Sequence, residues 1–102
     1  MTERHCLGLR GEFDLANYEE LERRLDEAIA ATDGEFVIDC RDLTFIDSSG
    51  VEALAHARVA LEAVGRDIRI VHATGAPLRV LELLGLTALL HVNEEAPVHN
   101  DA

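Results

Sequence analysis

Apolar and polar residues alternate along the chain in short blocks whose period switches between about two and about 3.6 residues. Blocks typical of strands and helices follow one another, beginning and ending with a strand. They cover residues 6–11, 17–31, 36–38, 49–64, 68–72, 77–84 and 88–92. Because parallel neighbouring strands need crossover connections, this order predicts an α/β fold with a predominantly parallel sheet of four strands and three main helices. A fifth strand is left open.

Capping and stop signals support the predicted helix ends. Asn17 followed by Glu20 has the capping-box spacing that begins a helix. Pro77 in a first-turn position opens the third helix, and Gly85 closes it.

Length and charge restrict the function. The chain has 102 residues, which fits a single domain over residues 1–102, with residues 93–102 expected to form a flexible tail. The net charge of −11 argues against nucleic acid and anionic membrane surfaces as partners. All nine basic residues are arginine, so chemistry that needs a lysine is excluded. No leader and no membrane-spanning apolar run is found, so we expect a cytoplasmic protein.

The cysteines and histidines give little sign of chemistry. Cys6 and Cys40 lack CxxC spacing and fall in predicted strands, so two small buried hydrophobes are the favoured interpretation. A redox pair that links the two strands is the alternative. The five histidines show no metal-ligand spacing with one another or with the cysteines, and we expect no metal and no cofactor.

The most informative segment is Leu43–Gly50, where a strand leads into a helix. Ligands and partners of parallel sheets gather at the carboxyl ends of the strands. Ser49 and Glu52 have capping-box spacing, so Ser49 is predicted to cap the helix. The adjacent Ser48 would then lie just outside the helix, exposed beside free N–H groups and the positive end of the helix dipole. The pattern therefore predicts a structural cap and a phosphate acceptor side by side.

The run FVIDCRDLTFIDSSGVEAL, residues 36–54, resembles the central signature of STAS domains in anti-sigma factor antagonists. The segments LRGEFDL (9–15) and APLRVLELLGL (76–86) are similar to the strand and turn that precede it and to the third helix of that family. The resemblance implies a STAS-like fold in which Ser48 is phosphorylated by an anti-sigma factor serine kinase and dephosphorylated by a phosphatase. It also implies that Asp47, Ser49 and Gly50 belong to the phosphorylation motif, and that Asp14 lies near it.

The implied function is a switch in protein binding and not an enzymatic activity. The unphosphorylated form would bind the anti-sigma factor and free the sigma factor, and phosphorylation would end that binding. On a helical wheel Val51, Ala55 and Val59 form a narrow apolar stripe beginning beside Ser48, where we expect the partner to bind. The alternative is a constitutive STAS interaction module, such as an accessory subunit of an ABC-type transporter or part of a signalling scaffold. Formation of a homodimer is left open.

Overall fold

The computed structural model describes residues 4–94, which form three strands and three helices in alternating order. The strands are β1 (Arg4–Phe13), β2 (Glu35–Ile46) and β3 (Ile68–Val71). The helices are α1 (Tyr18–Ala30), α2 (Ser48–Glu62) and α3 (Gly75–Leu83). The α/β class and the predicted order of elements as far as the third helix are confirmed.

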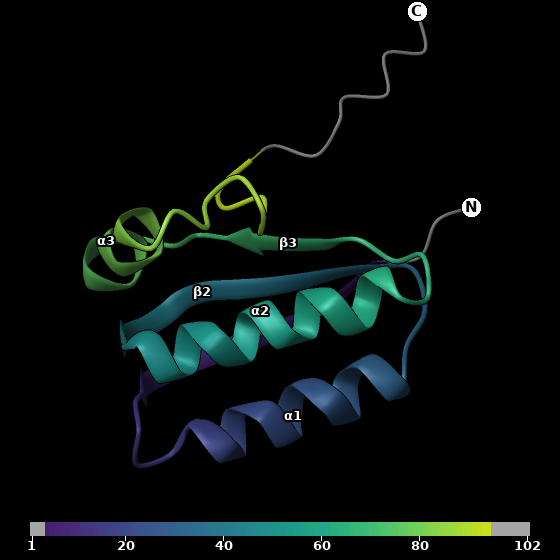
Figure 1. Ribbon diagram of the computed structural model, residues 1–102, viewed down its shortest axis with the longest axis horizontal. Helices are drawn as coiled ribbons and strands as arrows, with labels where there is room; N and C mark the ends of the chain where they lie inside the picture. Colours follow the sequence, from purple (N-terminus) through teal and green to yellow (C-terminus); the bar gives the residue numbers. More distant parts are fainter. Residues whose placement is uncertain (1–3, 95–102) are drawn as a thin grey trace, which may run out of the picture.

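The three strands form one parallel sheet in the order β1-β2-β3. Figure 1 shows the two crossover helices, α1 and α2, side by side on the same face of this sheet. This arrangement follows from right-handed crossovers that step across the sheet in the same direction. The hydrophobic core lies between that face and the two helices, and it includes Leu9, Ile38 and Ile70 from the strands and Leu25 and Leu54 from the helices.

Two extra residues in β2 interrupt its pairing with β1. The register shifts lie between the pairs Gly8–Asp39 and Arg10–Asp42, and between the pairs Gly11–Leu43 and Glu12–Phe45. At both places β2 contributes one residue more than β1, which is the arrangement of a β-bulge. The predicted strand at 36–38 is therefore too short, because the bulges break the apolar alternation that would have extended it. The bulged half of β2 continues past β3, and α3 packs against it.

The prediction of a fourth strand at 88–92 is wrong for the described residues. The segment forms successive turns closed by local bonds, such as that from the Val92 N–H to the Thr87 carbonyl at 2.9 Å. His91 and Asn93 have φ values of 50° and 56°, in the left-handed region that strands do not use. A single bridge, between Ile70 and Val92, joins the segment to β3 within residues 4–94. The sheet consequently has three strands rather than four or five.

Asn93, the first residue of the predicted tail at 93–102, is bonded to the rest of the domain. Its side-chain Oδ1 accepts the Ala73 N–H at 3.0 Å, and its Nδ2 donates to the Ala73 carbonyl at 2.8 Å. This pair of bonds fixes the chain after β3 to the chain that follows α3. The remainder of the predicted tail, residues 95–102, lies outside the described residues.

Cys6 and Cys40 are free thiols that cannot pair with each other. Cys6 lies opposite Val37 in the sheet, three residues before Cys40, so their Cα atoms are about 10 Å apart along the strands. A disulfide needs a Cα separation under about 7 Å. Burial, with a further contribution from the Asp39 carboxylate, raises the pKa of Cys40 to about 12. The redox pair is therefore wrong, and the buried interpretation is confirmed for Cys40 but not for the exposed Cys6.

Arg66 stabilises the connection between α1 and β2 through hydrogen bonds. Its Nε donates to the Gly34 carbonyl at 2.8 Å, Nη1 to the Ile29 carbonyl at 2.9 Å and Nη2 to the Thr32 hydroxyl at 2.9 Å. The guanidinium carbon lies 5.9 Å from the centre of the Phe36 ring, within cation–π range. Because all three nitrogens of the guanidinium are engaged, Arg66 has a structural role.

Candidate functional site

The segment that leads from β2 into α2 lies at the carboxyl edge of the sheet, at the left-hand end of Figure 1. Ser48 is the first residue of α2 and is exposed to solvent. Within residues 4–94 its hydroxyl forms no hydrogen bond. An exposed and unbonded hydroxyl in the first turn of a helix is accessible to a second protein.

Asp47 is the N-cap of α2. Its backbone is extended, and its side-chain Oδ1 accepts the N–H groups of Ser49 at 2.9 Å and of Gly50 at 3.2 Å. The capping box predicted from Ser49 and Glu52 is therefore wrong. The helix begins one residue earlier than predicted, because an aspartate caps a helix as well as a serine does. Ser48 consequently lies inside the first turn rather than just before it.

The loop between β1 and α1 is hydrogen-bonded to the same aspartate. The Leu15 N–H donates to Asp47 Oδ2 at 3.1 Å, and the Asp47 N–H donates to the Phe13 carbonyl at 3.1 Å. Asp14 lies between these two bonded residues, which places it in the loop against Asp47. The structure therefore brings Asp14 to the adjacent pair Asp47 and Ser48, more than thirty residues further along the chain, at one edge of the sheet.

Asn17 stabilises this loop instead of capping α1. Its Oδ1 accepts the Asp14 N–H at 2.8 Å, and its Nδ2 donates to the Glu12 carbonyl at 2.9 Å. No side-chain bond from Asn17 reaches the first turn of α1, so the predicted capping box with Glu20 is wrong. The side chain is occupied by the turn that follows β1.

Gly50 allows α2 to approach the ends of β1 and β2 closely. A Cβ atom at this position would lie 2.5 Å from Ile46 Cγ1, 2.9 Å from Ile46 Cδ1 and 3.3 Å from the Phe13 carbonyl oxygen. Ile46 is completely buried and has little room to move away. The glycine of the D-S-S-G motif therefore has a packing role that does not depend on any partner.

The predicted contact stripe on α2 is exposed only in part. Val51 is 1% exposed and belongs to the core, so its prediction as a surface contact is wrong. Ala55 is half-buried, whereas Val59 is 60% exposed. Since α2 packs against α1 as well as the sheet, its buried arc is wider than that of a helix covered on one side only.

Two exposed apolar side chains near the loop were not predicted from the sequence as contact residues. Leu15 is 72% exposed, and its N–H is bonded to Asp47. Phe45 is 38% exposed and precedes Asp47 by two residues. Two features of the sequence could have indicated these residues. One is a leucine in the otherwise polar turn after β1, and the other is a phenylalanine near the end of a bulged strand. Exposed apolar side chains grouped beside an accessible loop are typical of protein contact surfaces.

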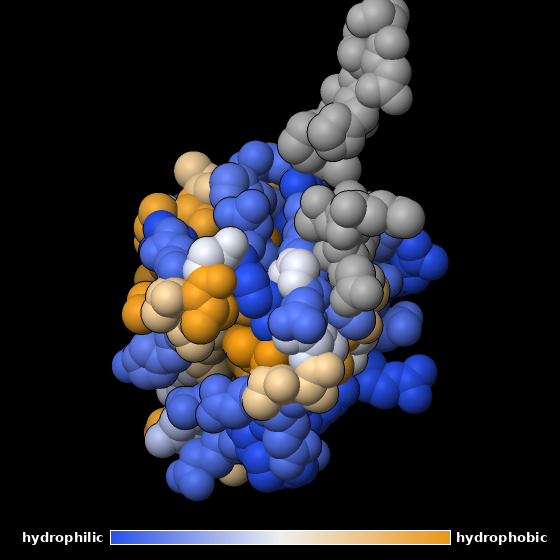
Figure 2. Space-filling view, turned by 90° about the vertical axis from the view of Figure 1, so that its right-hand side faces the viewer, coloured by the Kyte–Doolittle hydropathy of each residue, from blue (hydrophilic) through white to orange (hydrophobic). Residues whose placement is uncertain are grey.

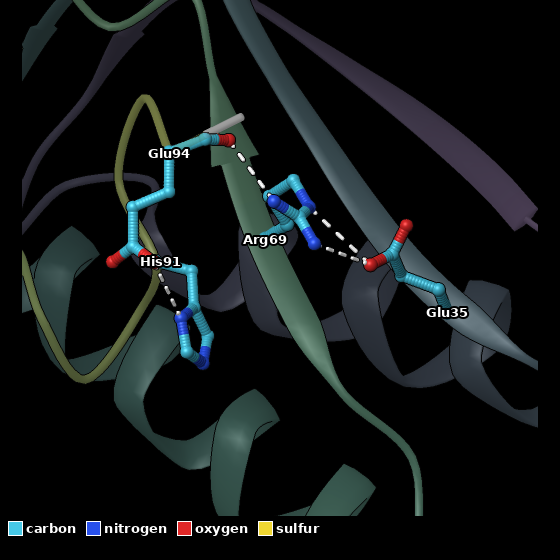
Figure 3. A network of polar contacts seen from close by, with 4 residues as sticks. All are labelled: Glu35, Arg69, His91 and Glu94. Carbon is cyan, nitrogen blue, oxygen red and sulfur yellow. Dashed lines mark hydrogen bonds and ion pairs between the residues drawn. The ribbon is translucent and has the colours of Figure 1, made fainter. Parts of the chain in front are cut away.

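A polar network, drawn in Figure 3, includes Glu35 at the start of β2, whereas Ser48 follows the end of that strand. Arg69 Nη2 is 2.9 Å from Glu35 Oε2, and Arg69 Nη1 donates to the Glu94 carbonyl at 3.0 Å. The Glu94 carboxylate in turn contacts His91 Nδ1 at 3.1 Å. This network joins β2, β3 and the segment after α3. Figure 2 looks onto this end of the molecule, where hydrophilic residues surround several apolar patches.

Residues 4–94 contain neither a cluster of metal ligands nor a membrane-spanning helix. No group of three histidine, cysteine or acidic side chains in this part of the chain is placed to hold a metal ion. None of its helices is long and apolar enough to cross a membrane.

The sequence profile of the STAS family described as "Mlab, STAS domain" matches residues 2–91. The chain therefore belongs to the STAS domain family, and the resemblance stated for residues 36–54 is confirmed. No curated protein sequence matches the chain significantly.

Solved structures of similar fold include two anti-sigma factor antagonists. The antagonist from Mycobacterium paratuberculosis has a TM-score of 0.77 and 24% identity, covering 93% of this chain and 84% of that one. The antagonist SpoIIAA in its unphosphorylated form has a TM-score of 0.71 and 26% identity, with the same coverage of 93% and 84%. A sulfate transporter family protein from Wolinella succinogenes has a TM-score of 0.70 and 22% identity, covering 85% of this chain and 70% of that one. These likenesses establish the STAS-like fold.

Proposed function

We propose that this STAS domain is an anti-sigma factor antagonist and that the Ser48 hydroxyl is its phosphorylation switch. The unphosphorylated protein binds an anti-sigma factor with serine kinase activity, and the sigma factor is released. Phosphorylation of Ser48 ends this binding, and a phosphatase restores it. The observation that carries the proposal is the exposed, unbonded hydroxyl of Ser48 in the first turn of α2. The role of this chain is binding and regulation, with the catalysis performed by its partners.

The surface around Ser48 suits a partner that recognises a neutral hydroxyl. Leu15 and Phe45 offer exposed apolar side chains near the loop, and Val59 offers another about three turns further along α2. Phosphorylation adds about −1.5 to −2 charges at pH 7. That charge arises directly beside Asp47, in an interface from which water is excluded, so it weakens the complex by repulsion and desolvation.

Phosphorylation in vitro tests the proposal. A serine kinase captured with the purified chain at low ATP is supplied with ATP, and the modified residue is identified by mass spectrometry. We expect phosphate on Ser48, none on the Ser48→Ala variant, and normal modification of the matched control Ser49→Ala. Ser48→Glu should weaken kinase binding by more than about tenfold, a loss of about 1.4 kcal/mol or more. Undiminished phosphorylation of Ser48→Ala would reject the proposal.

A constitutive STAS interaction module is the second candidate. The structural likeness to a sulfate transporter family protein favours this function. The exposed Val59 favours it too, because a partner could bind this side chain whether or not Ser48 is phosphorylated. Affinity capture that recovers an ABC-type ATPase and no kinase supports this function. In that case Ser48→Glu leaves the capture unchanged, whereas Val59→Asp abolishes it.

A further inference from the structure

Ser48 lies where a helix could ordinarily stabilise an added phosphate. The first-turn N–H groups of a helix point outwards, and the dipole favours negative charge there. In this protein Asp47 Oδ1 already accepts the N–H groups of Ser49 and Gly50, at 2.9 Å and 3.2 Å. Gly50 is also buried. Among the described residues, the first-turn donor left for a phosphate is the N–H of Ser48 itself.

We propose that Asp47 keeps a phosphoryl group on Ser48 uncompensated by the helix. Its carboxylate occupies the donors that would neutralise the phosphate, and its own negative charge repels the phosphate. The added charge therefore remains at the surface, where it opposes the partner. This inference rests on the proposed function of Ser48, and it assigns Asp47 the role of a positioning residue for the charge.

Displacement of Asp47 by the phosphate is opposed by a third bond. Asp47 Oδ2 accepts the Leu15 N–H at 3.1 Å, so a phosphate that took over the two helix donors would also detach the loop between β1 and α1. The Asp47 backbone is held as well, since its N–H donates to the Phe13 carbonyl at 3.1 Å. The carboxylate therefore has more partners to lose than a phosphate on Ser48 has to gain.

An arginine on a neighbouring element could also neutralise a phosphate on Ser48. Arg23 and Arg58 are paired with Glu27 and Glu62 on their own helices, at 3.1 Å and 2.7 Å. Arg79 is exposed on α3, and α3 packs against the second half of β2, whose end leads to Ser48. A phosphate neutralised by Arg79 would contradict the proposal, so the experiment includes this residue.

The experiment installs phosphoserine at position 48 during translation, so no kinase is needed. The melting temperatures of the phosphorylated and unphosphorylated forms are compared in the wild-type protein and in three variants. In the wild-type protein we expect phosphorylation to lower the melting temperature by about 2–6 °C. Asp47→Asn retains the capping oxygen without the charge, so the decrease should shrink. Asp47→Gly leaves the helix donors free, and phosphorylation should raise the melting temperature. Arg79→Ala should behave as wild type.

Amide resonances give a second readout that does not depend on stability. In the wild-type protein the Ser49, Gly50 and Leu15 amide signals should change little on phosphorylation, whereas those of Ser49 and Gly50 should move strongly in Asp47→Gly. A rise in the wild-type melting temperature, with large shifts of all three amides, shows that the phosphate has displaced Asp47 and overturns the inference. A deeper decrease in Arg79→Ala than in wild type overturns it too. These measurements contain no kinase, so they test the role of Asp47 alone. The proposed function is rejected by a different result, namely that no kinase modifies Ser48.

Discussion

Replacement of Gly50 by alanine separates packing from recognition at the D-S-S-G motif. In Gly50→Ala the new methyl group would start 2.5 Å and 2.9 Å from two carbons of Ile46 and 3.3 Å from the Phe13 carbonyl oxygen. Ile46 is completely buried, and the Phe13 carbonyl is held by the Asp47 N–H at 3.1 Å. Neither neighbour can yield without a shift of the end of the sheet against α2.

The size of the effect follows from two opposing contributions. Alanine is favoured over glycine by up to about 1 kcal/mol in a helix interior, and by less in the first turn. Overpacking of a well-filled core costs about 1–3 kcal/mol. We therefore expect Gly50→Ala to lower the free energy of unfolding by about 1–2 kcal/mol, which corresponds to a decrease of about 4–12 °C in the melting temperature.

Thermal unfolding followed by circular dichroism measures this decrease. Gly8→Ala is the matched control, since a Cβ atom at Gly8 meets no atom within 4 Å and its backbone is not left-handed. The melting temperature of Gly8→Ala should be unchanged or slightly higher. Kinase binding by Gly50→Ala, measured well below its melting temperature, should stay close to wild type if the glycine acts through packing alone.

A double-mutant cycle can refute this reasoning. Ile46→Ala removes the two carbons that the new methyl group would meet, at a cost of about 2–5 kcal/mol by itself. In that background the further change Gly50→Ala should cost little or nothing. Equal costs of Gly50→Ala in both backgrounds would show that the contact with Ile46 is not the reason for the glycine.

Three further predictions concern stability, and a fourth concerns the reactivity of the two thiols. Asp47→Ala removes the N-cap of α2 and should lower the free energy of unfolding by about 1–2 kcal/mol in urea titrations, whereas Asp47→Asn should cost less than about 0.5 kcal/mol. Arg66→Lys cannot reproduce the three bonds of the guanidinium and should cost about 1–3 kcal/mol in the same assay; a loss below about 0.5 kcal/mol would contradict its structural role. The pKa of Cys40 rises from 9.0 to about 12 on folding, so the folded state retains the proton after the unfolded state has lost it. Stability should therefore fall as the pH rises from about 9 toward 12, and Cys40→Ala should lose part of this pH dependence of the urea midpoint. Thiol labelling of the native protein should modify Cys6 and spare Cys40.

Tertiary contacts explain the sequence-based predictions that are wrong. A helical wheel of α2 predicts Val51 in an exposed apolar stripe, but α2 packs against α1 as well as the sheet, and its buried arc includes Val51. The apolar residues of 88–92 are spaced as in a strand, and Leu90 and Val92 are indeed buried, yet left-handed backbone at His91 turns the chain into a series of turns. A hydrophobic pattern reports which residues are buried and cannot distinguish a strand from turns of similar spacing.

The sequence by itself determined the order of strands and helices as far as the third helix, the α/β class and the accessible serine at the start of α2, because these depend on local periodicity and on a contiguous motif. The tertiary structure alone decided which residue caps α2, since an aspartate and two serines compete locally and the loop from β1 favours the aspartate by donating the Leu15 N–H. It also decided that Leu15 and Phe45 are exposed near the motif, and it supplies the bonds that hold Asp14 beside the motif, where the family resemblance implies it. These features join segments about thirty residues apart in the chain, a distance over which propensity and spacing carry no information.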